Sequence, residues 1–191
     1  MNIHLNIGPQ HDIASRFIEL LTGSRDTRMC WRFLPESPAE KKRIADHEKT
    51  ERIRTGNRSY CLRRNYDGGL DEVWADLLEC QKHNWGTFVV INEGGRDKKS
   101  ITKVRALFVD GDGISLPVEW HTEPDFIVQR DDTHWHAYWR VTDCPLDQFQ
   151  QTQLRLAAYY NTDPAVKDLP RVMRVPGTLH CKSHPQIVTL H

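Results

Sequence analysis

The chain has 191 residues, of which 38% are hydrophobic and 27% charged, the ordinary composition of a soluble globular domain. Its 26 basic side chains equal its 26 acidic ones. A protein that mainly coats duplex DNA is usually more basic, because phosphate neutralisation dominates that affinity, so any nucleic-acid contact here needs locally concentrated charge. No apolar run is long enough to cross a bilayer, and the start MNIHLNIGPQ lacks the layout of a signal peptide, so we expect the cytoplasm as compartment.

The first half of the chain reads as helices alternating with short strands. Apolar residues at helical spacing predict a helix over about 12–21, and a strand follows over 27–34. The segment Ser37-Pro38-Ala39-Glu40 is a capping box with proline at the first helical position, and it predicts a highly charged helix to about Arg54. The next expected elements are a strand over 59–63 and an amphipathic helix over 70–83.

The second half is richer in strands. The apolar run 87–91 predicts a buried strand. A loop at 94–95 follows, and a second buried strand is expected over 104–109. Strands over 126–129 and 134–141 flank a polar turn and predict a hairpin. A helix over about 145–160 and short strands near 172–173 and 187–188 follow. Because strands and helices do not strictly alternate, the pattern favours an α+β fold over a doubly wound parallel sheet.

The motif LFVDGD is the most informative in the chain, because a buried strand runs directly into Asp110 and Asp112. In an extended chain residues i and i+2 point to the same side, so both carboxylates converge. Gly111 between them allows a ligand or a neighbouring backbone to approach closely. Two adjacent carboxylates repel each other, and a hard divalent cation such as Mg²⁺ or Mn²⁺ relieves that repulsion. A polar turn that merely ends a strand is the alternative.

A second polar surface is expected on the strand HWHAYWRV. Alternation places its even-numbered residues on one face and its odd-numbered residues on the other. The odd-numbered set is apolar and aromatic and should pack in the core, which leaves the even-numbered set facing a polar site. The even-numbered residues are His134, His136, Tyr138 and Arg140.

The segment from Asp168 to Lys182 combines an acid with several bases. Arg171 and Arg174 stand three residues apart, and Lys182 follows a Pro-Gly turn. Arginine makes forked hydrogen bonds to phosphate oxygens and lysine supplies a point charge, so this set suits a metal–nucleotide site. Each residue taken alone is equally compatible with a solvated loop.

In this order the three segments, the last of them containing RVMRVPGT, resemble the archaeo-eukaryotic primase superfamily, and within it the RepB-like primases of plasmids and other mobile elements. The resemblance covers about 12–182. It implies one primase–polymerase catalytic domain over 1–191, with an RRM-like β-sheet lobe over about 86–191 that carries the acids. A smaller N-terminal α/β lobe would occupy about 1–85. Because the chain ends in an apparent strand, VTLH, we expect a C-terminal region of the parent protein to follow.

The resemblance also implies a two-metal site. The family's first motif supplies two metal-binding acids, matched by Asp110 and Asp112, and its third motif supplies another, matched by Asp168. Two Mg²⁺ or Mn²⁺ ions between these acids would activate a 3′-hydroxyl and hold the α-phosphate and the leaving pyrophosphate. The implied activity is template-directed nucleotidyl transfer on single-stranded DNA, from NTP or dNTP, in the replication of a plasmid, phage or mobile element.

The family's second motif supplies a histidine that contacts the triphosphate of the incoming nucleotide, a role assigned here to His136. The small hydroxyl residue that the family places close before this histidine is Thr133, directly before His134, so both histidines stay candidates. The other expected nucleotide contacts are Thr133, His134, Tyr138, Arg171, Arg174 and Lys182.

Template binding is expected on the basic segment after the charged helix, with a solvated helix as the alternative. The other expected partner is a replicative helicase or a C-terminal helical domain of the same protein. The expected DNA-binding residues are Arg52, Arg54, Arg58, Arg63 and Arg64, with Tyr60 and Tyr66 for base stacking.

The main competing interpretation is an HUH-type endonuclease of the kind that initiates rolling-circle replication. His134 and His136 would bind one metal, and Tyr159 or Tyr160 on a later helix would attack DNA to form a phosphotyrosyl bond. This interpretation leaves the Asp-x-Asp motif and the segment 168–182 unexplained. A non-catalytic domain that binds DNA or nucleotide is the third possibility.

Overall fold

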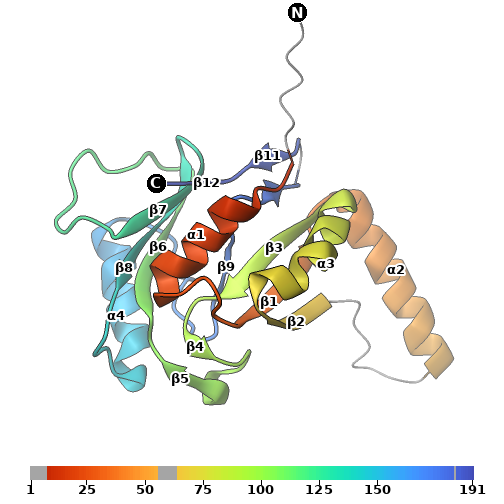
Figure 1. The fold of residues 1–191 in the computed structure, drawn as a ribbon, viewed down its shortest axis with the longest axis horizontal. Coiled ribbons are helices and arrows are strands. Elements are labelled where there is room, and N and C mark those ends of the chain that lie inside the picture. The colour runs from red at the N-terminus through yellow and green to blue at the C-terminus, as the bar shows by residue number, and fades with distance from the viewer. Residues whose placement is uncertain (1–7, 56–63, 183) are drawn as a thin grey trace, which may run out of the picture.

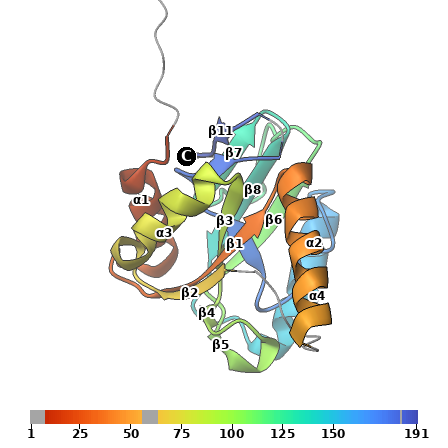
Figure 2. The same ribbon diagram turned by 90° about the vertical axis from the view of Figure 1, so that its right-hand side faces the viewer.

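The computed structural model describes residues 8–55, 64–182 and 184–191. Helices pack against two four-stranded antiparallel sheets, which confirms the expected α+β class (Figure 1). Helices α1 and α3 lie on one side of the strands, and α2 and α4 lie on the other (Figure 2). None of the described helices is both long enough and apolar enough to span a membrane.

The first sheet joins distant parts of the chain in the order β2-β1-β3-β9. It therefore takes strands from both sides of the lobe boundary expected near residue 85. On β1 every second residue is buried, because that face packs under α1 (His11–Thr22) and α3 (Leu70–Lys82). The strands are β1 (Met29–Pro35), β2 (Arg64–Gly68), β3 (Trp85–Val90) and β9 (Val172–Arg174).

The second sheet carries the Asp-x-Asp motif and the histidine strand, and its strand order is β12-β7-β8-β6. Helix α4 (Leu146–Tyr159) covers the outer edge of β6, where the Gln153 amide bonds to both the backbone N–H and the C=O of Phe108. This contact satisfies the Phe108 backbone groups at the edge of the sheet. The strands are β6 (Ala106–Asp112), β7 (Phe126–Asp131), β8 (His134–Arg140) and β12 (Thr189–Leu190).

One hydrophobic core spans both sheets. Phe17 of α1 packs edge-on against Phe126 and Tyr138 of the second sheet, while its helix lies beside α3 of the first. A smaller aromatic cluster on the other face of the second sheet includes Trp135 and Trp139. The two sheets are thereby held at a fixed relation, which the site between them requires.

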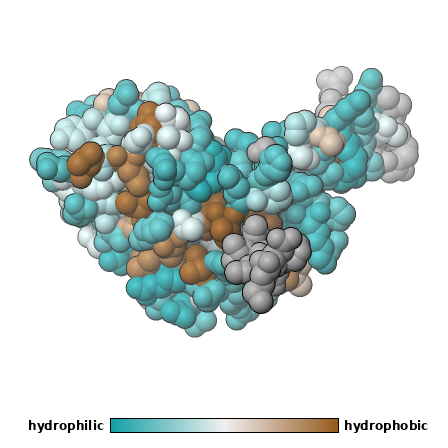
Figure 3. Space-filling model, turned by 90° about the horizontal axis from the view of Figure 1, so that it is seen from above, coloured by the Kyte–Doolittle hydropathy of each residue, from teal (hydrophilic) through white to brown (hydrophobic). Residues whose placement is uncertain are grey.

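Helix α2 (Pro38–Thr55) begins as the capping box predicts, because the Ser37 hydroxyl accepts from the backbone N–H of Glu40 at 3.2 Å. The Glu40 carboxylate accepts from Trp85 and Arg43 rather than from the cap backbone. The helix projects from the body of the molecule, with a largely hydrophilic surface (Figure 3).

The strand expected over 59–63 lies outside the described residues, and β2 begins at Arg64. The segment expected as a loop at 94–95 instead forms a small hairpin. The hairpin consists of β4 (Glu93–Gly94), the 3₁₀ turn η1 (Lys98–Ser100) and β5 (Ile101–Lys103). Elsewhere, β10 (Leu179–His180) pairs with β11 (Gln186–Ile187) in a separate two-stranded sheet.

Candidate active site

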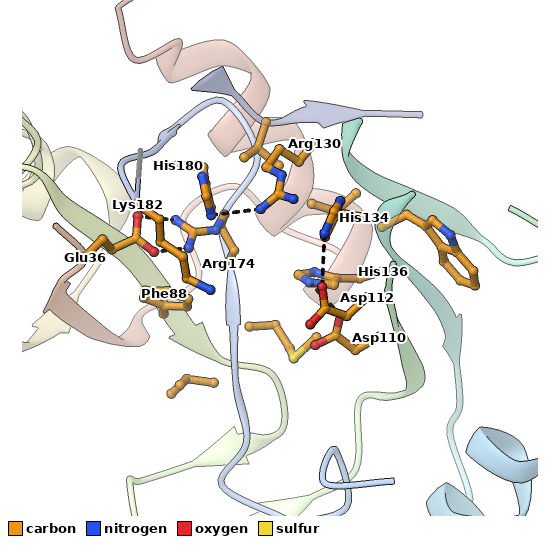
Figure 4. A pocket seen from close by; sticks show the side chains of 15 residues that line it. Glu36, Phe88, Asp110, Asp112, Arg130, His134, His136, Arg174, His180 and Lys182 are labelled. Carbon is orange, nitrogen blue, oxygen red and sulfur yellow. Dashed lines mark hydrogen bonds and ion pairs between the residues drawn. The ribbon is translucent and has the colours of Figure 1, made fainter. Parts of the chain in front are cut away.

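A cleft of about 220 Å³ lies between the two sheets and collects most of the predicted site residues (Figure 4). We call it the catalytic cleft. The second sheet contributes acids and histidines from β6 and β8, and the first sheet contributes side chains from β3 and β9. The lining of the catalytic cleft includes Glu36, Phe88, Asp110, Asp112, Arg130, His134, His136, Arg174, His180 and Lys182.

The acid pair, Asp110 and Asp112, lies within β6, so the polar-turn alternative is excluded. The ladder sets Asp110 opposite His136 and Asp112 opposite His134, with ring Nε2 to carboxylate distances of 3.5 and 3.1 Å. The intervening Gly111 lies on the Trp135 indole, where an added Cβ would stand 2.3 Å from a ring carbon. Glycine is therefore needed to keep the acid-bearing strand close to the aromatic ring behind it.

Electrostatic repulsion is already present at the acid pair. Burial, together with the charges of Asp112 and Asp163, raises the pKa of Asp110 to about 6, against the opposing effect of Lys182 and Arg171. Carboxylate oxygens are the donors that Mg²⁺ and Mn²⁺ prefer, so the chemistry of the pair suits a hard cation. Within the described ranges, however, no three His, Cys, Asp or Glu side chains are grouped as metal ligands.

The structure does not bring Asp168 to the acid pair. Its carboxylate forms an ion pair with Arg171 at 2.7 Å, and both side chains line a neighbouring cavity. The acid nearer to Asp110 is Asp163, whose backbone N–H donates to the Asp110 carbonyl at 3.1 Å. The sequence contains a signal for Asp163, since it begins an Asp-Pro turn just after α4, but spacing alone does not show which acid folds back.

Both predicted histidines line the catalytic cleft, in different environments. Burial, together with the charges of Arg174 and Arg130, lowers the pKa of His136 to about 3, so its imidazole is neutral at physiological pH. The ring of His134 lies between Asp131 at 2.7 Å and Asp112 at 3.1 Å. Thr133, expected at the nucleotide, instead lies within hydrogen-bonding distance of Asp131 and His134.

Tyr138 and Arg140 do not face the catalytic cleft as the alternation predicts. The Tyr138 ring is fully buried and stacks on Phe126, with centroids 4.7 Å apart. Arg140 pairs with Asp125 away from the acid pair. The alternation along β8 is correct, but Phe17 of α1 covers this end of the face, so Tyr138 becomes a core residue.

The predicted phosphate-binding arginines are both engaged by acids. Arg174 is buried in an ion pair with Glu36 and lies 4.5 Å from the centroid of the Phe88 ring. Arg171 lies in the neighbouring cavity. Lys182 is exposed at the catalytic cleft and takes part in no ion pair with a described residue, which leaves its charge available to a ligand.

Sequence reasoning missed Glu36 and Arg130. Glu36 accepts from the backbone N–H of Cys181 at 2.7 Å as well as from Arg174, so it holds the segment that carries Lys182. Arg130 lines the catalytic cleft and lies 2.9 Å from the His180 ring. No local pattern marks Glu36, because its partners lie more than a hundred residues away in the sequence.

Most of the expected template-binding residues cannot be placed. Arg58, Arg63 and Tyr60 lie outside the described residues, and for Arg52, Arg54 and Arg64 only the backbone is described. Tyr66 is half-buried, donates to Asp76 at 3.1 Å and packs on Phe33, so its ring serves the fold.

The two tyrosines of the endonuclease interpretation lie on the side of the second sheet opposite to His134 and His136. Tyr160 stacks on Trp139, with centroids 5.5 Å apart, and Trp139 is on the face of β8 opposite to the histidines. Tyr159 is exposed beside it. In this arrangement neither hydroxyl reaches a phosphate held by His134 and His136.

Residues 97–188 match the family model of the RepB DNA-primase N-terminal domain. The structure is similar to the AEP domain of the cyanophage S-2L primase–polymerase, with a TM-score of 0.70 and 17% identity over 96% of this chain and 90% of that one. It is also similar to primase RepB′ (TM-score 0.58, 15% identity, 95% of this chain and 55% of that one). A third similar structure is the RepB′ catalytic domain in complex with initiator DNA, with a TM-score of 0.58 and 16% identity over 95% of this chain and 83% of that one. No curated protein matches. These findings confirm the resemblance to archaeo-eukaryotic, RepB-like primases.

Proposed function

We propose that this chain, a domain of the archaeo-eukaryotic primase type, performs metal-dependent, template-directed nucleotidyl transfer on single-stranded DNA. The observation that carries the proposal is the acid pair, two carboxylates on one strand of a cleft that also holds a neutral histidine and Lys182. The solved complex of the similar RepB′ domain with initiator DNA supports DNA as the template class.

Asp110 and Asp112 would hold the divalent cation, which when bound supplies Lewis acidity toward a 3′-hydroxyl and the phosphates. His136 is neutral, so it binds a phosphate oxygen as a hydrogen-bond donor rather than as a charge. Lys182 supplies the positive charge that stabilises the triphosphate as the bond to pyrophosphate breaks. Arg174, held by Glu36, orients this segment instead of reaching the substrate.

The proposed third ligand is Asp163 rather than Asp168. The charge of Asp163 already raises the pKa of Asp110, and its backbone is bonded to Asp110. The Asp163 carboxylate is exposed, one of its oxygens accepts from the backbone N–H of Ala165 at 2.8 Å, and no described base neutralises it, whereas the Asp168 carboxylate is held in an ion pair by Arg171.

The test is nucleotide incorporation on single-stranded DNA with Mg²⁺ or Mn²⁺, using NTPs and dNTPs in separate reactions. We expect metal-dependent products that fall by roughly a thousandfold in Asp110→Asn/Asp112→Asn, because the cation loses both ligands. Equal product from the double variant, with native circular dichroism, would contradict the proposal.

Tyr159→Phe/Tyr160→Phe is the matched control for the endonuclease alternative. It keeps both rings, including the stack on Trp139, and removes only the hydroxyls. We expect normal incorporation and no protein covalently attached to DNA. Strand cleavage that this variant abolishes would establish the endonuclease instead.

A further inference from the structure

A second cavity of about 410 Å³ adjoins the catalytic cleft, and its wall is rich in positive charge. We call it the basic cavity. Its lining includes five basic side chains and only two acidic ones. Four of the bases are half-buried and one is exposed. The bases are Arg32, Arg96, Lys98, Lys167 and Arg171.

The basic cavity adjoins the catalytic cleft at the first sheet. Val172 of β9 lines both, with Arg171 on one side and Arg174 on the other. The strand register sets Arg32 beside Phe88 and Phe88 beside Arg174, so one row of side chains leads from the basic cavity into the cleft.

The acids nearby leave part of this charge unbalanced. Asp168 pairs with Arg171, and Arg96 pairs at 2.8 Å with Asp67, which does not line the basic cavity. Lys98 and Lys167 take part in no ion pair with a described residue. Cations gathered in a concave, partly desolvated wall create a field that is relieved by an anion.

We propose that the basic cavity binds the sugar–phosphate backbone of the single strand that enters or leaves the catalytic cleft. This inference rests on the proposed function, and it specifies where the DNA strand contacts the protein outside the catalytic cleft. Arginine forks and lysine ammonium groups suit phosphodiester oxygens. None of the described residues that line the basic cavity is aromatic, so we expect the contact to be to the sugar–phosphate backbone and independent of base sequence.

The test is fluorescence anisotropy of a labelled oligothymidylate with the full chain, in EDTA and without nucleotide, over a range of salt concentrations. We expect Lys98→Gln/Lys167→Gln to weaken binding about tenfold and to reduce the slope of log affinity against log salt by about 1.4, or about 0.7 for each phosphate contact. Asp147→Asn, which removes an exposed acid from the wall, should tighten binding about twofold.

Lys99→Gln is the matched control, because Lys99 is exposed in the same 3₁₀ turn as Lys98 but does not line the basic cavity. It should change the affinity by less than about twofold. The single variant Lys98→Gln, at an exposed position, guards against misfolding of the double variant.

Unchanged DNA affinity in the double variant overturns the proposal. If only the affinity for a free dNTP falls, measured with Mn²⁺ by calorimetry, the basic cavity holds a triphosphate and the strand assignment is overturned. Because the DNA-binding assay contains neither metal nor nucleotide, its outcome does not depend on nucleotidyl transfer. A failure of nucleotidyl transfer and a failure of strand binding are therefore distinguishable.

Discussion

Asp110 carries an energetic cost in the folded protein. Its pKa rises from 3.8 to about 6, so the folded state binds a proton more tightly than the unfolded chain. An acid with a raised folded pKa destabilises the fold above about pH 6, and the penalty disappears as the pH falls below the unfolded value.

Asp110→Asn should therefore be more stable than wild type by about 3 kcal/mol at pH 8, with little difference at pH 3.5. Urea unfolding at the two pH values checks this. Asp112→Asn is the comparison, and its free energy of unfolding should increase less because the Asp112 side chain is exposed. A variant that loses stability at pH 8 would show that Asp110 makes favourable contacts which outweigh its burial.

Single substitutions also distinguish the two candidates for the third metal ligand, Asp163 and Asp168. Asp163→Asn should lower nucleotide incorporation by about a hundredfold, because a cation loses one ligand, while Asp168→Asn should lower it less than tenfold. Both variants keep the side-chain shape. Steady-state rates at saturating Mn²⁺ distinguish them, and a loss in Asp168→Asn as large as that in Asp163→Asn would restore the assignment made from the sequence.

Sequence reasoning located the acid pair because the i, i+2 rule of strands is local. It could not locate the partner of Arg174, because Glu36 lies 138 residues away. It also placed Tyr138 at the site, since alternation reveals which face a residue is on but not that Phe17 covers that part of the face.

At the scale of elements, the Glu36–Arg174 ion pair fixes the end of β1 against β9. Both side chains are buried, and an added Cβ at Gly86 of β3 would stand 2.6 Å from the Glu36 carboxyl carbon. The pair and the glycine therefore form one packed unit across three strands. The unit also determines where the segment leading to Lys182 lies.

Glu36→Ala should cost about 3–5 kcal/mol of unfolding free energy, because it leaves the Arg174 charge buried without its partner. Glu36→Ala/Arg174→Met should recover at least about 1 kcal/mol of that loss. Urea denaturation of the two single variants and the double variant gives the coupling. Additive losses would show that the two side chains act independently.

For the whole molecule, local periodicity predicted most elements, including α1, α3, α4 and the β7–β8 hairpin, because the spacing of apolar residues in a helix or strand depends only on residues close in sequence. It did not predict the assembly of strands. The three residues of β9 join a sheet whose other strands end at Val90, and β12 returns to pair with β7. Such pairings depend on contacts distant in sequence, and they create the cleft between the sheets.

The most direct test of the central claim, that Asp110 and Asp112 hold a divalent cation, is Mn²⁺ binding followed by electron paramagnetic resonance of the free ion. With a non-hydrolysable nucleotide present, wild type should bind Mn²⁺ and Asp110→Asn/Asp112→Asn should bind at least about tenfold more weakly, because carboxylate oxygens are lost. Equal affinity in the two proteins would mean that the cation is held elsewhere, and the acid pair would not be the catalytic centre.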